Sequence, residues 1–149
     1  MCEGRTQNLP EIRVQPDKTP GYWIDALNGD EDLDGVLFVE SESFTNPWTR
    51  DMYAWELQNR AVCHILVVRT ADRPVVGFCA FWLVVDEIHI NNVAILPDLR
   101  GQGIGTTLMN RVFDEAIGLA VQTFATQQAL EVQRRHAHVP AAVHLADEL

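Results

Sequence analysis

The residues best suited to chemistry in this chain lie in a short stretch between an apolar run and an amphipathic one. Arg100 is followed by glycine at three alternate positions, Gly101, Gly103 and Gly105. A glycine loop that leads into a helix presents unpaired backbone N–H groups at the positive end of the helix dipole. Glycine lets the main chain approach a phosphate closely, and arginine can add a charge-assisted contact. The stretch therefore predicts an anion site, with phosphate as the usual ligand.

The spacing of these glycines excludes two common phosphate loops. The dinucleotide pattern G-x-G-x-x-G requires glycine at position 106 or 108, where the chain has Thr106 and Leu108. The P-loop pattern requires G-K-S/T, which is absent. What the stretch does contain is R-x-x-G-x-G over residues 100–105, directly after an apolar run that ends in Pro97.

The strands that must position this loop are predicted from apolar runs with short connections. We expect strands over 63–69, 75–85 and 88–95, and consecutive strands joined so closely form an antiparallel meander. A Rossmann unit uses parallel strands, so this arrangement also argues against one. The first 30 residues are rich in turn signals, with one candidate edge strand over 11–15.

Helices are predicted on both sides of these strands in the chain. Apolar spacing of three and four predicts a helix from Asp32 to about Ser43, and Thr49 can cap a second helix over 50–60. After Gly103, apolar residues four apart predict a third helix. Beyond residue 119 two alternatives stay open, a strand followed by a helix or one extended helix.

Composition limits the class of protein. A chain of 149 residues that is 47% apolar predicts a single domain over 1–149. It contains no apolar run of about 18 residues and no apolar signal core, so we expect a cytoplasmic protein without a membrane partner. The net charge of −10 argues against nucleic acid and favours a basic protein partner. Cys2, Cys63 and Cys79 lack metal-ligand spacing and are expected to be reduced thiols.

The loop and its strand–loop–helix context resemble the coenzyme A pyrophosphate loop of the GCN5-related N-acetyltransferases. The resemblance implies an α/β (α+β) fold, with a mainly antiparallel mixed sheet flanked by helices, and acetyl-CoA as co-substrate. In that family a bulge opens beside the strand before the loop so that pantetheine can pair with it. The resemblance assigns the strand edge to Val93, Ala94 and Ile95. It assigns the pyrophosphate cradle to Arg100, Gly101, Gln102, Gly103, Ile104, Gly105 and Thr106.

A second segment, residues 40–49, resembles the E-x-x-x-F-x-x-P-W element of RimI-type members of this family. Those enzymes acetylate the N-terminal alanine of ribosomal protein S18, and the residues before the loop, 92–97, match them too. The resemblance implies acetyl transfer to a protein N-terminal α-amine, with a basic acceptor such as ribosomal protein S18. It makes Phe44, Pro47 and Trp48 candidate substrate contacts. Packing is the alternative role for Phe44 and Trp48.

Three residues are candidates for the general base. The resemblance points to Glu131, within Leu130-Glu131-Val132, and a carboxylate can act if burial raises its pKa. Glu87 and His89 on the preceding strand are alternatives, since related enzymes relay the proton from there. The competing interpretations are that Glu131 is exposed and inert, and that His89 is an ordinary strand residue without a catalytic role.

The resemblance covers residues 11–132 and is lost over 133–149. Ala146 stands where the family has its proton-donating Tyr, and the only tyrosines are Tyr22 and Tyr53. Water or His144 could replace that Tyr, and the usual last strands are not found. The alternative hypothesis is therefore a catalytically impaired CoA-binding remnant of a truncated or frameshifted gene. Another is a chain that folds poorly because a sheet edge stays unpaired.

A metal site near the end of the chain is the last candidate. His136, His138 and His144 precede the carboxylate pair Asp147-Glu148. No cysteine lies near them, and this is the one carboxylate pair there, so we expect no metal.

Overall fold

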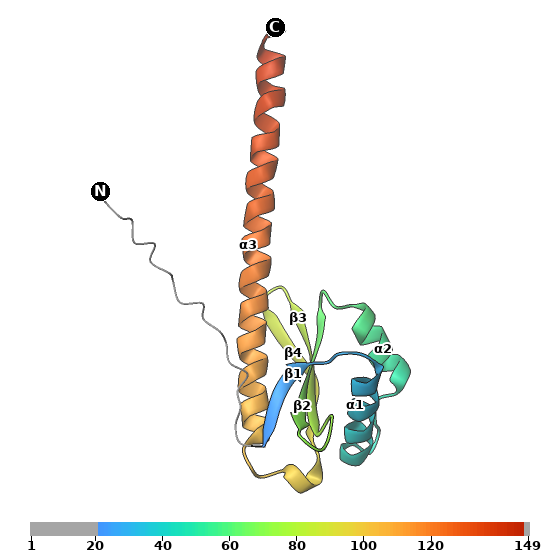
Figure 1. Cartoon of the computed structure of the whole chain (residues 1–149). Coiled ribbons are helices and arrows are strands. Elements are labelled where there is room, and N and C mark those ends of the chain that lie inside the picture. Colours follow the sequence, from blue (N-terminus) through green and yellow to red (C-terminus); the bar gives the residue numbers. More distant parts are fainter. Residues whose placement is uncertain (1–20, 148–149) are drawn as a thin grey trace, which may run out of the picture.

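The computed structural model describes the backbone of residues 21–147 and the side chains of residues 21–134. Within this part, four strands form one sheet in the order β1-β2-β3-β4, and each neighbouring pair is antiparallel. Helices α1 and α2 lie against one face of the sheet and α3 against the other (Figure 1). The elements are β1 (Tyr22–Ala26), α1 (Asp30–Ser43), α2 (Arg50–Gln58), β2 (Cys63–Thr70), β3 (Gly77–Val84), β4 (Glu87–Ile95), a 3-10 turn (Pro97–Leu99) and α3 (Ile104–Asp147).

The predicted meander is confirmed, and its strands begin and end within two residues of the expected bounds. The turn after β2 closes through Thr70, whose N–H donates to the Arg73 carbonyl at 3.0 Å. Between β3 and β4 the connection is only two residues long, and Val85 takes a positive φ of 58° there. Connections this short join antiparallel neighbours and leave no room for a crossover.

Strand β1 was not predicted, because its five residues lie between turn signals at Gly21 and at 28–30. It forms by pairing with β2, from Tyr22 opposite Thr70 to Ala26 opposite Leu66. Such a partner is distant in sequence, so local propensity does not reveal it. The candidate edge strand over 11–15 lies outside the described residues.

Helices α1 and α2 confirm the sequence prediction, with small shifts at their ends. Thr49 caps α2, and its Oγ1 accepts the Met52 N–H at 3.4 Å. Helix α1 begins two residues before Asp32. Within the helix, the Asp32 carboxylate accepts the Asn28 N–H at 2.6 Å. Both of its oxygens also accept from the Arg69 guanidinium, each at 2.6 Å. This ion pair ties α1 to β2.

The core is layered around the sheet. Side chains of β2 and β3, such as Val67, Phe78 and Phe81, are fully buried between the helices. Helix α1 contributes Val36 and Val39 on its face of the sheet. Helix α3 contributes residues at the predicted spacing of four: Ile104, Leu108, Val112 and Ala116. Burial of these stripes is what holds the helices to the sheet.

Helix α3 runs without a break to Asp147, so of the two alternatives beyond residue 119 the extended helix is the one observed. Every residue of 121–134 is exposed, and α3 continues past the sheet (Figure 1). The expected sheet was mixed, but within residues 21–147 it is wholly antiparallel, since no strand follows β4 there to add a parallel partner. In the described part of the chain, no helix has both the length and the apolar character to cross a membrane.

Candidate active site

The predicted glycine loop connects β4 to α3, and Arg100 fastens it in place. The Arg100 guanidinium donates from Nε to the Ile95 carbonyl at 2.8 Å and from Nη2 to Ser43 Oγ at 3.2 Å. The loop is thereby joined to the last residue of β4 and to the end of α1. The anion contact predicted for Arg100 stays a prediction, and the role that the structure shows for its guanidinium is to position the loop.

Two of the three glycines are required by backbone conformation. Gly101 and Gly103 have φ values of 77° and 83°, which residues with a Cβ rarely adopt. A Cβ at either position would project into open space, with no protein atom within 4 Å. Gly105 differs, because it lies in the first turn of α3 and faces Ile95. The positive φ therefore explains Gly101 and Gly103, and the space in front of them is open to a ligand.

The start of α3 supplies free donors at this open space. The first helical hydrogen bond runs from the Thr107 N–H to the Gly103 carbonyl at 3.1 Å. The N–H groups of Ile104, Gly105 and Thr106 precede it and have no carbonyl of their own helix to bond. Unpaired donors at the positive end of the helix dipole suit an anion such as a pyrophosphate. The loop thus fits the pyrophosphate of acetyl-CoA.

Strand β4, which leads toward this loop, carries a bulge at Asn91. Ala80 lies opposite Asn92 and Phe81 opposite Ile90, so Asn91 has no partner residue on β3. The Asn91 Nδ2 is buried and makes no hydrogen bond among the described atoms. A bulge bends a strand and interrupts its ladder, and on the other side β4 has no neighbouring strand within residues 21–147. The strand before the loop thus has the bulge and the unpaired edge that the family resemblance implies.

A pocket of about 250 Å³ lies between this edge and the end of α1. It brings Phe44, predicted to contact the acceptor, together with residues predicted to hold the acyl donor. These two motifs are about 50 residues apart in the sequence. The pocket is lined by Ser43, Phe44, Val93, Ala94, Ile95 and Arg100.

Buried Glu40 explains why the two motifs lie together. It is 1% exposed, and its Oε1 accepts the Trp48 N–H at 2.8 Å and the Asn92 amide at 2.9 Å. Its Oε2 accepts the Tyr53 hydroxyl at 2.9 Å, and burial raises the pKa of Tyr53. Glu40 therefore holds the turn after Phe44 against β4, directly beside the bulge. The roles of Tyr53 and Asn92 were missed, although two consecutive asparagines in an apolar strand were a visible signal.

The remaining acceptor-side residues, Pro47 and Trp48, lie apart from this pocket. Pro47 is exposed. Trp48 packs on Tyr53, with ring centroids 5.3 Å apart, and lines a separate pocket with Trp55 and Trp82. Trp48 therefore both packs on Tyr53 and lines a pocket.

The three candidate bases lie in two different places. Glu87 and His89 are exposed on β4, with His89 Nε2 3.1 Å from Glu87 Oε2. Glu131 lies on α3, in the exposed stretch 121–134. It is about 22 Å along the helix axis from Ala116, the last buried residue among the side chains described, 21–134. The structure therefore brings Glu87 and His89 to the strand of the site and does not bring Glu131 there. All three roles stay predictions.

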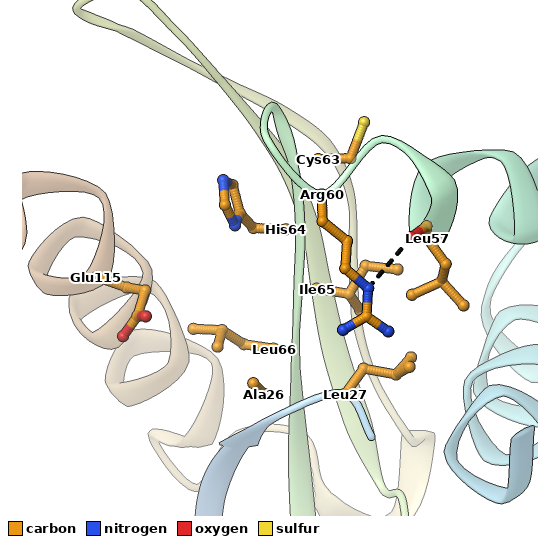
Figure 2. A pocket seen from close by; sticks show the side chains of 9 residues that line it. All are labelled: Ala26, Leu27, Leu57, Arg60, Cys63, His64, Ile65, Leu66 and Glu115. Carbon is orange, nitrogen blue, oxygen red and sulfur yellow. Dashed lines mark hydrogen bonds between the residues drawn. The ribbon is translucent and has the colours of Figure 1, made fainter. Parts of the chain in front are cut away.

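A further pocket, at the β1–β2 end of the sheet, contains none of the predicted site residues (Figure 2). It measures about 130 Å³, and its Arg60 Nε donates to the Leu57 carbonyl at 3.2 Å. Its Cys63 is a buried free thiol, as is Cys79, and burial raises the pKa of each to about 12. Both thiols are therefore protonated and unsuited to attack. The third cysteine, Cys2, lies outside the described residues.

No cluster of three metal-ligating side chains occurs within the described part of the chain. The side chains of His136, His138 and His144, and the Asp147-Glu148 pair, lie outside it.

Relatives of known description match most of this chain. A ribosomal protein bS18-alanine N-acetyltransferase of Escherichia coli (strain K12) is 27% identical over 118 residues, which are 79% of this chain and 73% of the relative. A Bacillus subtilis (strain 168) protein provisionally given the same name is 40% identical over 103 residues, 69% of this chain. The chain spans 65% of the length of the latter, just under two thirds.

Solved structures share the fold. The ribosomal-protein-S18-alanine N-acetyltransferase from Escherichia coli superposes with a TM-score of 0.57 at 24% identity, over 64% of this chain and 59% of that one. A GNAT family N-acetyltransferase from Escherichia coli in complex with CoA gives 0.56 at 18% identity, over 64% and 56%. The family model described as "Acetyltransferase (GNAT) family" matches residues 15–138. The chain therefore belongs to the GNAT family of acetyltransferases.

Proposed function

We propose that the protein transfers the acetyl group of acetyl-CoA to a protein N-terminal α-amine, and that the acceptor is the N-terminal alanine of ribosomal protein bS18. The observation that carries the proposal is the pocket in which Phe44 meets the edge of β4 and Arg100. It joins the motif expected to bind the acceptor to the motif expected to bind the donor. The names of the two bacterial relatives support the choice of acceptor.

The donor side of the site is built from backbone groups. Acetyl-CoA, when bound, supplies an acyl group activated as a thioester. The N–H groups of Ile104, Gly105 and Thr106 are available to its pyrophosphate. Val93, Ala94 and Ile95 pair with β3 on one side, and their other edge, which has no strand neighbour within residues 21–147, is available to its pantetheine. The bulge at Asn91 bends β4 just before these residues.

On the acceptor side, an amine must lose a proton before it can attack. His89 is the base we assign, because it lies on β4 and its Nε2 contacts the Glu87 carboxylate, which can orient the imidazole. Proton transfer to His89 can be direct or through water. The net charge of −10 would steer a basic acceptor protein toward the site.

The first experiment is calorimetric titration of the purified protein with acetyl-CoA. We expect micromolar binding, and its loss in Gly103→Glu, which forces a Cβ onto a positive φ and places a carboxylate among the N–H donors. The matched control is Gly118→Glu, since Gly118 is helical and also faces open space. No binding by the folded wild-type protein, or equal loss in both variants, would contradict the proposal.

Turnover is tested next, on a peptide with the bS18 N-terminal sequence and on the same peptide already acetylated at its N-terminus. Acetylation of only the first peptide supports the α-amine as acceptor. His89→Gln should then lower kcat/KM with little effect on acetyl-CoA affinity. An unchanged kcat/KM would mean that a residue other than His89 acts as the base.

A second candidate function is CoA binding without catalysis. The two tyrosines favour it, because neither is available as a proton donor. The Tyr53 hydroxyl donates to Glu40 at 2.9 Å, and the Tyr22 hydroxyl donates to Thr107 Oγ1 at 3.1 Å. Acetyl-CoA binding that depends on Gly103, with no turnover on either peptide, would support this candidate over the first.

A further inference from the structure

An open pocket of about 490 Å³ lies on the α2 side of the sheet and shares no lining residue with the pocket between Phe44 and β4. Its walls are the side chains of Trp48, Met52, Trp55 and Trp82, and carboxylates of Asp51 and Glu56 complete the lining. Three of the four tryptophans in the chain therefore meet here.

The aromatic walls are partly open to solvent. Trp55 is 54% exposed and Met52 is 43% exposed. The Trp55 and Trp82 rings lie 6.3 Å apart at an interplanar angle of 55°, so they meet at an angle and do not stack face to face. Large apolar side chains gathered in an exposed hollow are typical of binding sites.

The pocket is negatively charged and contains no cation of its own. Glu56 is 2% exposed and accepts the Trp82 indole N–H at 2.7 Å. Within the described side chains, no ion pair joins Glu56 or Asp51 to a Lys, Arg or His. Indole faces attract cations, and a nearby carboxylate strengthens that attraction. The chemistry of the pocket thus matches a cation on an apolar stem.

The pocket lies on the same face of the sheet as His89, the base assigned to the acceptor amine. Trp82 is directly opposite His89 in the β3–β4 register, so their side chains lie on the same face of the sheet. Trp48 belongs to the turn that Glu40 holds against β4. A polypeptide with its amine beside β4 can therefore place a later side chain in this pocket.

We infer that this pocket is a subsite for the cationic side chain of a Lys or Arg that follows the N-terminal residue of the acceptor polypeptide. Its apolar walls accommodate the methylene stem, while the indole faces and the exposed carboxylate of Asp51 receive the charged end. Buried Glu56 orients the Trp82 indole and adds negative charge. The inference rests on the proposed function, since it requires a polypeptide acceptor.

Binding of short peptides tests the inference without acetyl-CoA. The probes begin with alanine and carry a single arginine at the second, third or fourth position among glycines. Each has a twin with citrulline, which keeps the shape and removes the charge. We expect one arginine peptide to bind about tenfold more tightly than its twin, measured by tryptophan fluorescence. Equal affinities in all three pairs would overturn the inference.

Variants locate the selectivity within the molecule. Trp55→Ala and Asp51→Asn alter exposed side chains and should abolish the preference for arginine over citrulline. The matched control is Phe124→Ala, which removes an exposed aromatic ring on α3 and should keep the preference. A preference that survives both pocket variants would place the cation elsewhere.

Turnover separates the subsite from the proposed reaction. Selective binding that depends on Trp55, without acetylation of any peptide, would support the subsite and contradict the proposed function. Acetylation of arginine and citrulline peptides with equal kcat/KM and equal affinity would support the proposed function and contradict the subsite.

Discussion

The two faces of the sheet are built in different ways. The side chains that α3 buries against the sheet are apolar, and they include Leu108, Val112 and Ala116. On the opposite face, α1 and α2 bury the carboxylates of Asp32, Glu40 and Glu56, which are the charged residues buried within the described side chains. Each of these three accepts named hydrogen bonds. Apolar burial has no direction, whereas hydrogen bonds do, so one face holds the fold together and the other also positions groups for a site.

The largest effect is expected on the apolar face, from Leu108→Ala. Leu108 is fully buried, and truncation leaves a cavity between α3 and the sheet. We expect the free energy of unfolding to fall by about 2–5 kcal/mol, measured by urea denaturation. Ile117→Ala is the control, because Ile117 is on the same helix but 61% exposed, and it should change stability by less than about 0.5 kcal/mol. Similar losses in both would mean that α3 is not packed as described.

A smaller loss of stability is expected on the polar face, from Glu40→Ala. The Tyr53 hydroxyl is buried and would lose its acceptor, at a cost of about 1–3 kcal/mol. Acetyl-CoA affinity and KM for the acceptor should also change, because the turn after Phe44 is no longer held against β4. Glu40→Gln should restore acetyl-CoA affinity and KM more than stability, since its amide oxygen can still accept from Trp48 and Asn92 whereas its NH2 group cannot accept the Tyr53 hydroxyl. If Glu40→Gln were as damaging as Glu40→Ala, the charge and not the geometry would be essential.

The smallest effects are expected on how the free energy of unfolding depends on pH, with one titrating group on each face of the sheet. Hydrogen bonding to Arg69 lowers the pKa of Asp32 from 3.8, so its stabilisation is present above that pH and is lost as pH falls through the folded-state value. On the α3 side, burial lowers the pKa of His64 from 6.5, against the opposing charge of Glu115. The unfolded chain then binds the proton more readily, and the free energy of unfolding falls as pH drops below 6.5.

Variants assign these two pH windows. Urea denaturation is measured across pH. Asp32→Asn should remove the pH dependence of the free energy of unfolding only in the acid range, below pH 3.8. His64→Gln should remove it only just below pH 6.5. A change in the other window in either variant would show that the two faces do not titrate independently.

What the sequence determined was local. Gly101 and Gly103 were predicted from their spacing, and they adopt the positive φ that only glycine takes at low cost. The Thr49 cap, the short-turn meander and the buried stripe of α3 followed in the same way, because each depends on residues a few positions apart. The resemblance to the GCN5-related acetyltransferases rested on the same loop, and the family match confirmed it.

Only the tertiary structure decided the contacts between distant residues. It paired β1 with β2, set Glu40 against Asn92, and gathered Trp48 and Trp82 around one pocket. It also carried Glu131 away from β4 on a continuous α3. The physical reason is that a buried carboxylate or a bulged strand is stabilised by partners many residues away, and a local pattern shows that a group is polar but not which donor it meets.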